Sequence, residues 1–258
     1  MTFSLLFLGT CACDYSPKLK DEYKDCFDKN ARRSSSALLD GKYLIDCGDH
    51  CLDELRIANV NAGEITDIFI THLHRDHYNV EHIRYIASAG ARTLCVWVRE
   101  DANVPEIENV QWRRMQTKTV CEVADGLTVT GLKANHNEDS FPQHLLFEKD
   151  GKKFLYACDG AGFLSETYYA LKNAELSLLV LDCTCGDYLG AFHLVTHNSI
   201  PLLRVILPSL KTLKTVTEDT QTYISHIAPS LHKSHDETVK MMAELGVNVA
   251  NDGLQIEV

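Results

Sequence analysis

The feature that most constrains this chain is a cluster of metal-binding residue types directly after an apolar segment. The cluster reads His72-Leu73-His74-Arg75-Asp76-His77, and the preceding run, Ile65 to Thr71, is rich in β-branched and aromatic residues. Such a run predicts a buried β-strand. Packing does not require so many polar groups at one strand end, and they are costly to bury. We therefore interpret the cluster as a site on a rigid scaffold rather than as a solvated histidine-rich loop.

The residue types in this cluster indicate a metal site. Histidine nitrogens and aspartate oxygens are suitable ligands for zinc, manganese and iron. His72 and His74 are two residues apart on an extended segment, so their side chains can turn to the same side. Asp76 and His77 fall beyond the strand and can face a second metal ion. The motif therefore predicts two divalent ions per chain, zinc or manganese or alternatively iron.

Composition narrows the class of protein and of partner. The 258 residues are 45% hydrophobic and 24% charged, which is typical of a globular chain. The net charge of −11 disfavours nucleic acid, which needs a basic surface. A small anionic substrate is compatible with this charge because bound divalent ions reverse the local field. The chain has no apolar run long enough for a signal peptide or a membrane span, so we expect a cytoplasmic protein that does not bind a membrane.

The ten cysteines are expected to be reduced thiols in such a protein. Cys11, Cys13 and Cys26 could hold a structural metal ion, but their spacing is loose and the chain contains no C-x-x-C pair. We therefore interpret the cysteines mainly as small core residues.

Strands and helices alternate along the chain without a linker or a repeat, which predicts a single domain over residues 1–258. Three Asp-Gly pairs, at Asp40, Asp125 and Asp150, each lie between two strand-like runs and predict hairpins. The last third is more helical. The segments predicted to be helical are Val80–Ala89, Ser165–Leu171, Ser199–Leu207 and His235–Leu245.

Three further polar residues follow separate predicted strands. His136 follows the strand that ends at Leu132, Asp159 follows the run Phe154 to Cys158, and His226 follows Tyr223 to Ser225. Each residue alone is weak evidence for a metal site, because a histidine at a strand end is more often a hydrogen-bonded structural residue. Their joint order after the first cluster completes two adjacent sites. The predicted ligands are His72, His74 and His136 on one metal, Asp76, His77 and His226 on the other, and Asp159 between them.

This order of motifs resembles the metallo-β-lactamase superfamily. The resemblance extends over nearly the whole chain and is strongest to the phosphodiesterase branch related to tRNase Z and to the cyclic-phosphate phosphodiesterase of the carbon–phosphorus lyase pathway. It implies an α/β fold, a four-layer αββα sandwich, with a dinuclear centre at the sheet edges; by analogy it also implies a homodimer. The motifs and segments that carry the resemblance are Asp46 in Leu44–Gly48, the HxHxDH motif with His136, Asp159 and His226, Arg32–Ser36, Leu181–Cys183, Ser225–Ala228 and Asp252–Glu257.

The chain departs from that branch in three places. It has Gly9-Thr10-Cys11 where a G-T-G loop is common, it does not reproduce the cysteine cluster of the cyclic-phosphate enzyme, and it has no long basic arm of the kind that grips tRNA. These departures, with the acidic charge, favour a small-molecule phosphodiester over tRNA as the substrate.

The implied chemistry is metal-assisted hydrolysis by a bridging hydroxide. The expected catalytic residues are Asp76, which is also a ligand, and a general acid. We assign the acid to His197, which precedes a predicted helix, as a histidine does in the related phosphodiesterases; His193 is the rival. Asp46 and Asp182 are expected to orient ligand histidines.

Two other functions remain open. The first is lactone or thioester hydrolysis at the same centre, which has less need of a separate imidazole acid. The second is a metal-binding sensor without catalysis, which the full set of seven ligands disfavours. Neither the substrate nor the metal can be named from the sequence.

Overall fold

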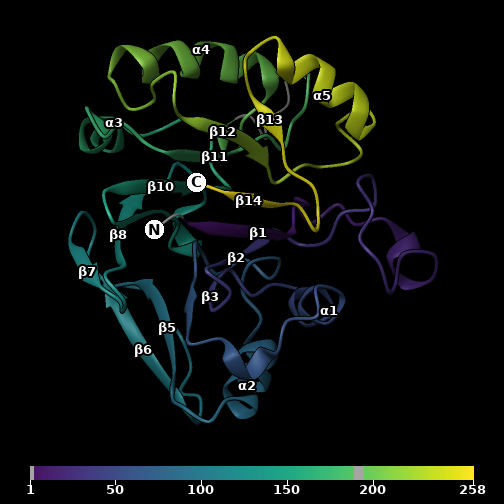
Figure 1. The fold of residues 1–258 in the computed structure, drawn as a ribbon, viewed down its shortest axis with the longest axis vertical. Helices are drawn as coiled ribbons and strands as arrows, with labels where there is room; N and C mark the ends of the chain where they lie inside the picture. Colours follow the sequence, from purple (N-terminus) through teal and green to yellow (C-terminus); the bar gives the residue numbers. More distant parts are fainter. Residues whose placement is uncertain (1–2, 189–194) are drawn as a thin grey trace.

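The computed structural model describes residues 3–188 and 195–258. Its strands form two mixed sheets that lie face to face, and within the described residues each sheet has seven strands (Figure 1). In order of pairing, the first sheet contains β14 (Gln255–Glu257), β1 (Ser4–Gly9), β2 (Ser36–Leu39), β3 (Tyr43–Ile45), β4 (Asp67–Phe69), β5 (Leu94–Arg99) and β6 (Val110–Met115). The second contains β13 (Asn248–Val249), β12 (Gln221–Ser225), β11 (Leu178–Asp182), β10 (Lys152–Ala157), β9 (Gln143–Lys149), β8 (Thr128–Lys133) and β7 (Val120–Glu122).

Helices cover the outer face of each sheet. The described helices are α1 (Cys51–Ile57), α2 (Val80–Ala89), α3 (Ser165–Leu171), α4 (Ile200–Thr212) and α5 (His235–Ala243), with short 3-10 turns at Pro17–Lys20, Ala62–Glu64 and Glu138–Ser140. Figure 1 shows α1 and α2 on the side of the first sheet and α3, α4 and α5 on the side of the second. The four-layer αββα sandwich predicted from the sequence is therefore confirmed. Among the described helices, none combines the length and the apolar composition needed to cross a bilayer.

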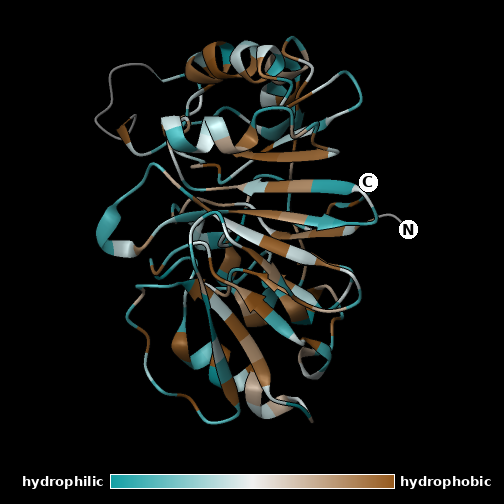
Figure 2. Ribbon diagram, turned by 90° about the vertical axis from the view of Figure 1, so that its left-hand side faces the viewer, coloured by the Kyte–Doolittle hydropathy of each residue, from teal (hydrophilic) through white to brown (hydrophobic). Residues whose placement is uncertain are grey.

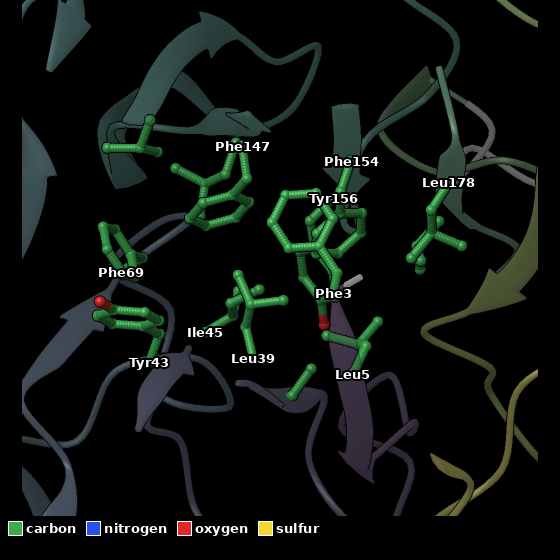
Figure 3. Close-up of a cluster of buried hydrophobic side chains, with 14 of the residues drawn as sticks. Phe3, Leu5, Leu39, Tyr43, Ile45, Phe69, Phe147, Phe154, Tyr156 and Leu178 are labelled. Atoms are coloured by element: carbon green, nitrogen blue, oxygen red, sulfur yellow. The ribbon is translucent and has the colours of Figure 1, made fainter. Parts of the chain in front are cut away.

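The layers follow from the two-residue period of the strands. On β10, Phe154 and Tyr156 point into the core between the sheets, whereas Leu155 points under the helices. Figure 3 shows aromatic rings meeting between the sheets, where Phe147 lies 5.1 Å from Phe69 and 5.6 Å from Phe154, measured between ring centroids. Hydrophobic residues accordingly concentrate on the central strands in Figure 2, and many peripheral loops are hydrophilic.

All three predicted Asp-Gly hairpins are present. They join β2 to β3, β7 to β8 and β9 to β10, and each pair of strands is antiparallel. The six turn residues have φ between 50° and 77°, the left-handed region that a two-residue hairpin turn requires at both positions. The sequence therefore determines these turns locally.

Helix α4 extends further than the sequence predicted. It continues through Pro208 to Thr212, although a proline inside a helix removes one backbone hydrogen bond. Its buried apolar side chains, which include Leu207 and Leu210, pack on the second sheet. Packing of this face outweighs the local cost of the proline.

The sheet topology brings several strand ends to one edge of the sandwich. Strands β3 to β6 run parallel in the first sheet, and β10 to β13 run parallel in the second. The carboxyl ends of parallel strands are where open α/β sheets bind ligands. The loops that follow β3, β4, β8, β10, β11 and β12 carry the polar residues considered next.

Candidate metal centre

The structure brings all seven predicted ligands together. The first four follow β4, and the other three follow β8, β10 and β12. They form two groups that share Asp159, and within each group the candidate ligand atoms lie within 4.8 Å of one another. The groups are His72, His74, His136 and Asp159, and Asp76, His77, Asp159 and His226.

In the first group, three imidazole nitrogens face one carboxylate oxygen. His74 Nδ1 lies 3.0 Å from His72 Nε2 and 3.2 Å from His136 Nε2. His72 Nε2 lies 3.0 Å from Oδ2 of Asp159. This is a nitrogen-rich set with one oxygen, which suits zinc or iron as well as manganese.

In the second group, two imidazoles face two carboxylates. The Nε2 atoms of His77 and His226 lie 3.1 Å apart. Oδ2 of Asp76 lies 3.4 Å from the first of these atoms and 3.7 Å from the second, and Oδ2 of Asp159 lies 3.5 Å from both. The same oxygen of Asp159 therefore faces both groups.

Buried acceptors fix the orientation of the ligand rings. Asp46 Oδ2 accepts a hydrogen bond from Nδ1 of His77 at 2.7 Å, and Asp182 Oδ2 lies 3.2 Å from Nδ1 of His226. The carbonyl oxygen of Thr196 accepts from Nδ1 of His136 at 3.2 Å. In a neutral ring that donates from Nδ1, Nε2 carries the lone pair, so these contacts turn the ligand nitrogens toward the two groups.

The donor atoms fit divalent cations. Two lone pairs 3.1 Å apart, as on Nε2 of His77 and His226, repel each other unless a cation or a proton lies between them. Two histidine nitrogens on one tetrahedral zinc, each at about 2.0–2.1 Å from it, lie about 3.3 Å apart. The observed separation is close to this value, so the residues are arranged to hold a metal ion.

The protonation states agree with this arrangement. Burial lowers the pKa of His72, His74 and His136, the last to about 4, so the first group is neutral and ready to bind metal. Burial also opposes charge on His77 and His226, but the neighbouring carboxylates outweigh it and raise the pKa of both, to about 9 for His226. Protons on these rings balance the buried carboxylates until a metal ion replaces them.

His197 lies beside both groups. Its Nδ1 is 3.1 Å from Oδ2 of Asp182 and 3.1 Å from Oδ1 of Asp159. Burial alone would lower its pKa, but the hydrogen bonds to these two carboxylates raise it to about 10. Ser199 caps α4 by accepting from the Leu202 amide, which places His197 two residues before this cap, as the sequence predicted. His193, the rival acid, lies outside the described residues.

The backbone at the centre departs from ordinary strand ends. Asp46, Asp159 and His226 each have φ between 53° and 62°, although none is glycine. Gly48 shows a different constraint, because a Cβ atom there would lie 1.8 Å from the carbonyl oxygen of Asp76. Only glycine allows the two loops to approach so closely.

A cavity of about 350 Å³ opens over the centre. Five of the seven predicted ligands (His74, Asp76, His136, Asp159 and His226), together with His197, line it. The remaining lining residues are Ala12, Cys13, Asp14, Thr184, Ala228, Ser230 and Leu231. This wall could not be predicted from the sequence, because its residues are ordinary loop residues far apart in the chain.

Several other polar residues lie outside the two ligand groups. His50, His82 and His144 belong to neither ligand group. Within the described residues no cysteine belongs to a group of three or more candidate ligands. Thr184 is a contact that the sequence did not reveal: its hydroxyl lies 2.9 Å from Oδ2 of Asp182 and 2.8 Å from Nδ1 of His226.

The fold and the paired His/Asp groups define a protein of the metallo-β-lactamase type. A family model described as "Beta-lactamase superfamily domain" matches residues 42–214, and the chain belongs to this superfamily of hydrolases. The predicted family and fold class are therefore confirmed.

Among curated proteins, the chain is 38% identical over 82 residues to "Zinc phosphodiesterase ELAC protein 1" of Bos taurus and 37% identical over 81 residues to the Homo sapiens protein. The aligned part spans 30% of this chain and only 19% of either relative.

Three solved structures share the fold over nearly the full length of both chains. They are the metallo-β-lactamase fold protein YhfI from Bacillus subtilis (TM-score 0.77, 15% identity, 100% of each chain), a diphosphatase from the PhnP family (0.73, 21%, 99% of this chain and 98% of that one) and human tRNase Z, short form (0.67, 17%, 98% of each).

Proposed function

We propose that this protein is a phosphodiesterase that hydrolyses a small phosphodiester at two divalent metal ions, and that residues 1–258 form one hydrolase domain. His72, His74 and His136 would hold one ion, Asp76, His77 and His226 the other, and Oδ2 of Asp159 would contact both. Bound ions would polarise the phosphoryl group and lower the pKa of water. Zinc is favoured by the name of the curated relatives, and manganese or iron would also suit these ligands.

The observation that carries the proposal is the position of His197. Its ring lines the cavity over the two ligand groups, and Asp182 accepts from Nδ1. With Nδ1 held by this carboxylate, Nε2 would be the nitrogen that gives a proton to a departing alkoxide. An alkoxide is a poor leaving group without that proton, and general acids contribute roughly 10²- to 10⁴-fold. A lactone or thioester has less need of such an acid.

The other groups of the centre have positioning roles. Asp182 holds His197 and His226 together, because Oδ2 lies 3.1 Å from the first ring and 3.2 Å from the second. Asp76 belongs to the second ligand group and also lines the cavity. We therefore propose that its carboxylate orients the attacking water. A small substrate rather than tRNA is favoured by the net charge of −11.

The test compares three substrate classes on one preparation. Bis(p-nitrophenyl) phosphate, a lactone and a thioester are offered to the purified protein, and its metal content is counted. We expect phosphodiester turnover with about two metal ions per chain, and loss of both in Asp159→Ala. His50→Gln is the matched control, since His50 lies outside both ligand groups. Turnover of the lactone or thioester alone would move the protein to that class. Full metal content with no turnover of any substrate would favour a sensor.

A further inference from the structure

Outside the ligand groups, two loops with little charge contribute to the wall of the cavity over the centre. One is the loop after β1 and the other is the loop after β12. The amide of Ser230 donates to Oδ2 of Asp14 at 2.8 Å, which ties the two loops together at this point. The side chains near this link are small or apolar: Ala12, Cys13, Ala228 and Leu231.

Among the described residues, no lysine or arginine lines this cavity. The segments 1–2 and 189–194 contain neither residue type in their sequence. Arg75, inside the HxHxDH motif, is exposed and its Nε lies 3.0 Å from Oδ2 of Asp49. An adjoining hollow beyond Ser230 has one lysine, Lys233, but Asp187 lines the same hollow. Among the described residues that line the cavity outside the ligand groups and His197, the one charged side chain is therefore the carboxylate of Asp14.

This distribution of charge should distinguish phosphodiester substrates by the number of negative charges that they carry. A phosphodiester carries one negative charge, which the metal centre itself can neutralise. A second phosphate or carboxylate on the same molecule would find no lysine or arginine among the described residues of the cavity wall and, away from His197, would face Asp14. An uncharged substituent would instead contact the small apolar side chains of the two loops.

We propose that the substrate is a phosphodiester with a single negative charge and uncharged substituents, and that Asp14 is the specificity residue that rejects a second anionic group. The inference rests on the proposed phosphodiesterase function and adds the substrate class to it. For two like unit charges roughly 7 Å apart, the Coulomb repulsion lowers a binding constant about 3-fold in water and about 50-fold at the effective dielectric of a protein surface. We expect discrimination of about tenfold.

The test uses two diesters of equal size that share p-nitrophenolate as the leaving group. The second ester is 4-carboxyphenyl in one and 4-carbamoylphenyl in the other, so only the charge differs. For the metal-loaded protein, kcat/KM of the carboxylate should be about tenfold below that of the amide. Asp14→Asn should bring the two within about threefold, because asparagine keeps an oxygen for the Ser230 amide but has no charge. Asp14→Glu should keep the discrimination, and Asp21→Asn, an exposed change in the same loop, should not alter it.

Binding gives a second readout that does not depend on turnover. Diaryl phosphinate anions that carry the same carboxylate or amide cannot be hydrolysed, because P–C bonds replace both ester P–O bonds. Calorimetry should show the same ratio between the Kd values of the two phosphinates. Equal kcat/KM for the two diesters, or a ratio that Asp14→Asn leaves unchanged, would overturn the inference while the phosphodiesterase function stands. Failure to hydrolyse either diester would overturn the proposed function and the inference together.

Discussion

Replacement of His197 by alanine should have an effect that depends on the leaving group. The proton that His197 would donate matters for an alkoxide and matters little for p-nitrophenolate, which leaves as a stable anion. For an alkyl leaving group, loss of the acid should lower kcat roughly 10²- to 10⁴-fold, or about 2.7–5.4 kcal/mol of transition-state stabilisation. For p-nitrophenolate we expect a loss below about tenfold.

The contacts of His197 set the size of a second, graded effect. Nδ1 lies 3.1 Å from a carboxylate oxygen of Asp182 and 3.1 Å from one of Asp159, so Asp182→Asn removes one of two charged acceptors. A hydrogen bond to a charged group contributes about 1.5–3 kcal/mol. Asp182→Asn should therefore cost about 10- to 100-fold with the alkyl leaving group, less than His197→Ala.

The assay compares two diesters that share one ester group and differ only in the leaving group. Each variant is measured with both diesters, and its metal content is determined because Asp182 also contacts His226. His197→Ala should keep the metal content of the unmodified protein, whereas Asp182→Asn is compared at saturating metal because Asp182 also orients His226. An equal loss with both leaving groups, at full metal content, would refute the assignment of His197 as a general acid and leave it a structural residue of the cavity wall.

Three further predictions follow from the buried charges. Asp46→Asn should weaken metal binding about 10- to 100-fold in a chelator competition, because Asp46 orients His77; unchanged affinity would show that the ring needs no carboxylate. Zinc loading at pH 7 should release about two protons per chain, because carboxylates raise the pKa of His77 and of His226 above the ordinary histidine value. Calorimetry in buffers of different ionisation enthalpy measures this release. Binding heats that do not depend on the buffer would contradict the prediction. Burial raises the pKa of Glu54 from 4.5 to about 8, so the folded chain holds this proton longer than the unfolded chain and its stability should fall as the pH rises through that range, by up to about 1.4 kcal/mol per pH unit. Glu54→Gln should remove this part of the slope in urea denaturation at pH 5 and pH 8, and an identical pH dependence in the two proteins would show that Glu54 is already ionised.

Much of the fold could be predicted because its signals are local. The Asp-Gly turns require φ above zero at both positions, and α5 begins with a capping box formed by Ser234 and Glu237, which are only three residues apart. The elements that were not predicted have weak local signals. Helix α1 is seven residues long, and the residue that precedes it, His50, makes no side-chain capping hydrogen bond. Strand β6 is the edge of its sheet and only its last residue, Met115, is buried, so it lacks the apolar run of a central strand.

The candidate site divides in the same way. The ligands could be placed from the sequence because costly polar residues at four strand ends share one explanation, which is a metal centre. The cavity wall could not, because Asp14 and Ser230 are 216 residues apart and meet only through the folded chain. No pattern in either loop encodes that contact. The substrate class therefore depends on tertiary structure, whereas the reaction type depends on motifs.

The left-handed residues explain why local rules alone do not build this centre. A strand that continues straight directs successive side chains to opposite faces, so residues after several strands would not converge on one point. At Asp46, Asp159 and His226 the chain turns through φ between 53° and 62°, a conformation that costs a non-glycine residue about 1–2 kcal/mol. Glycine would avoid this cost but would remove the carboxylate or imidazole. The chain therefore keeps strained residues where a ligand or its acceptor is needed, and uses glycine at position 48, where only space is needed. Local preference and function conflict at these positions, and such conflicts are expected at functional sites.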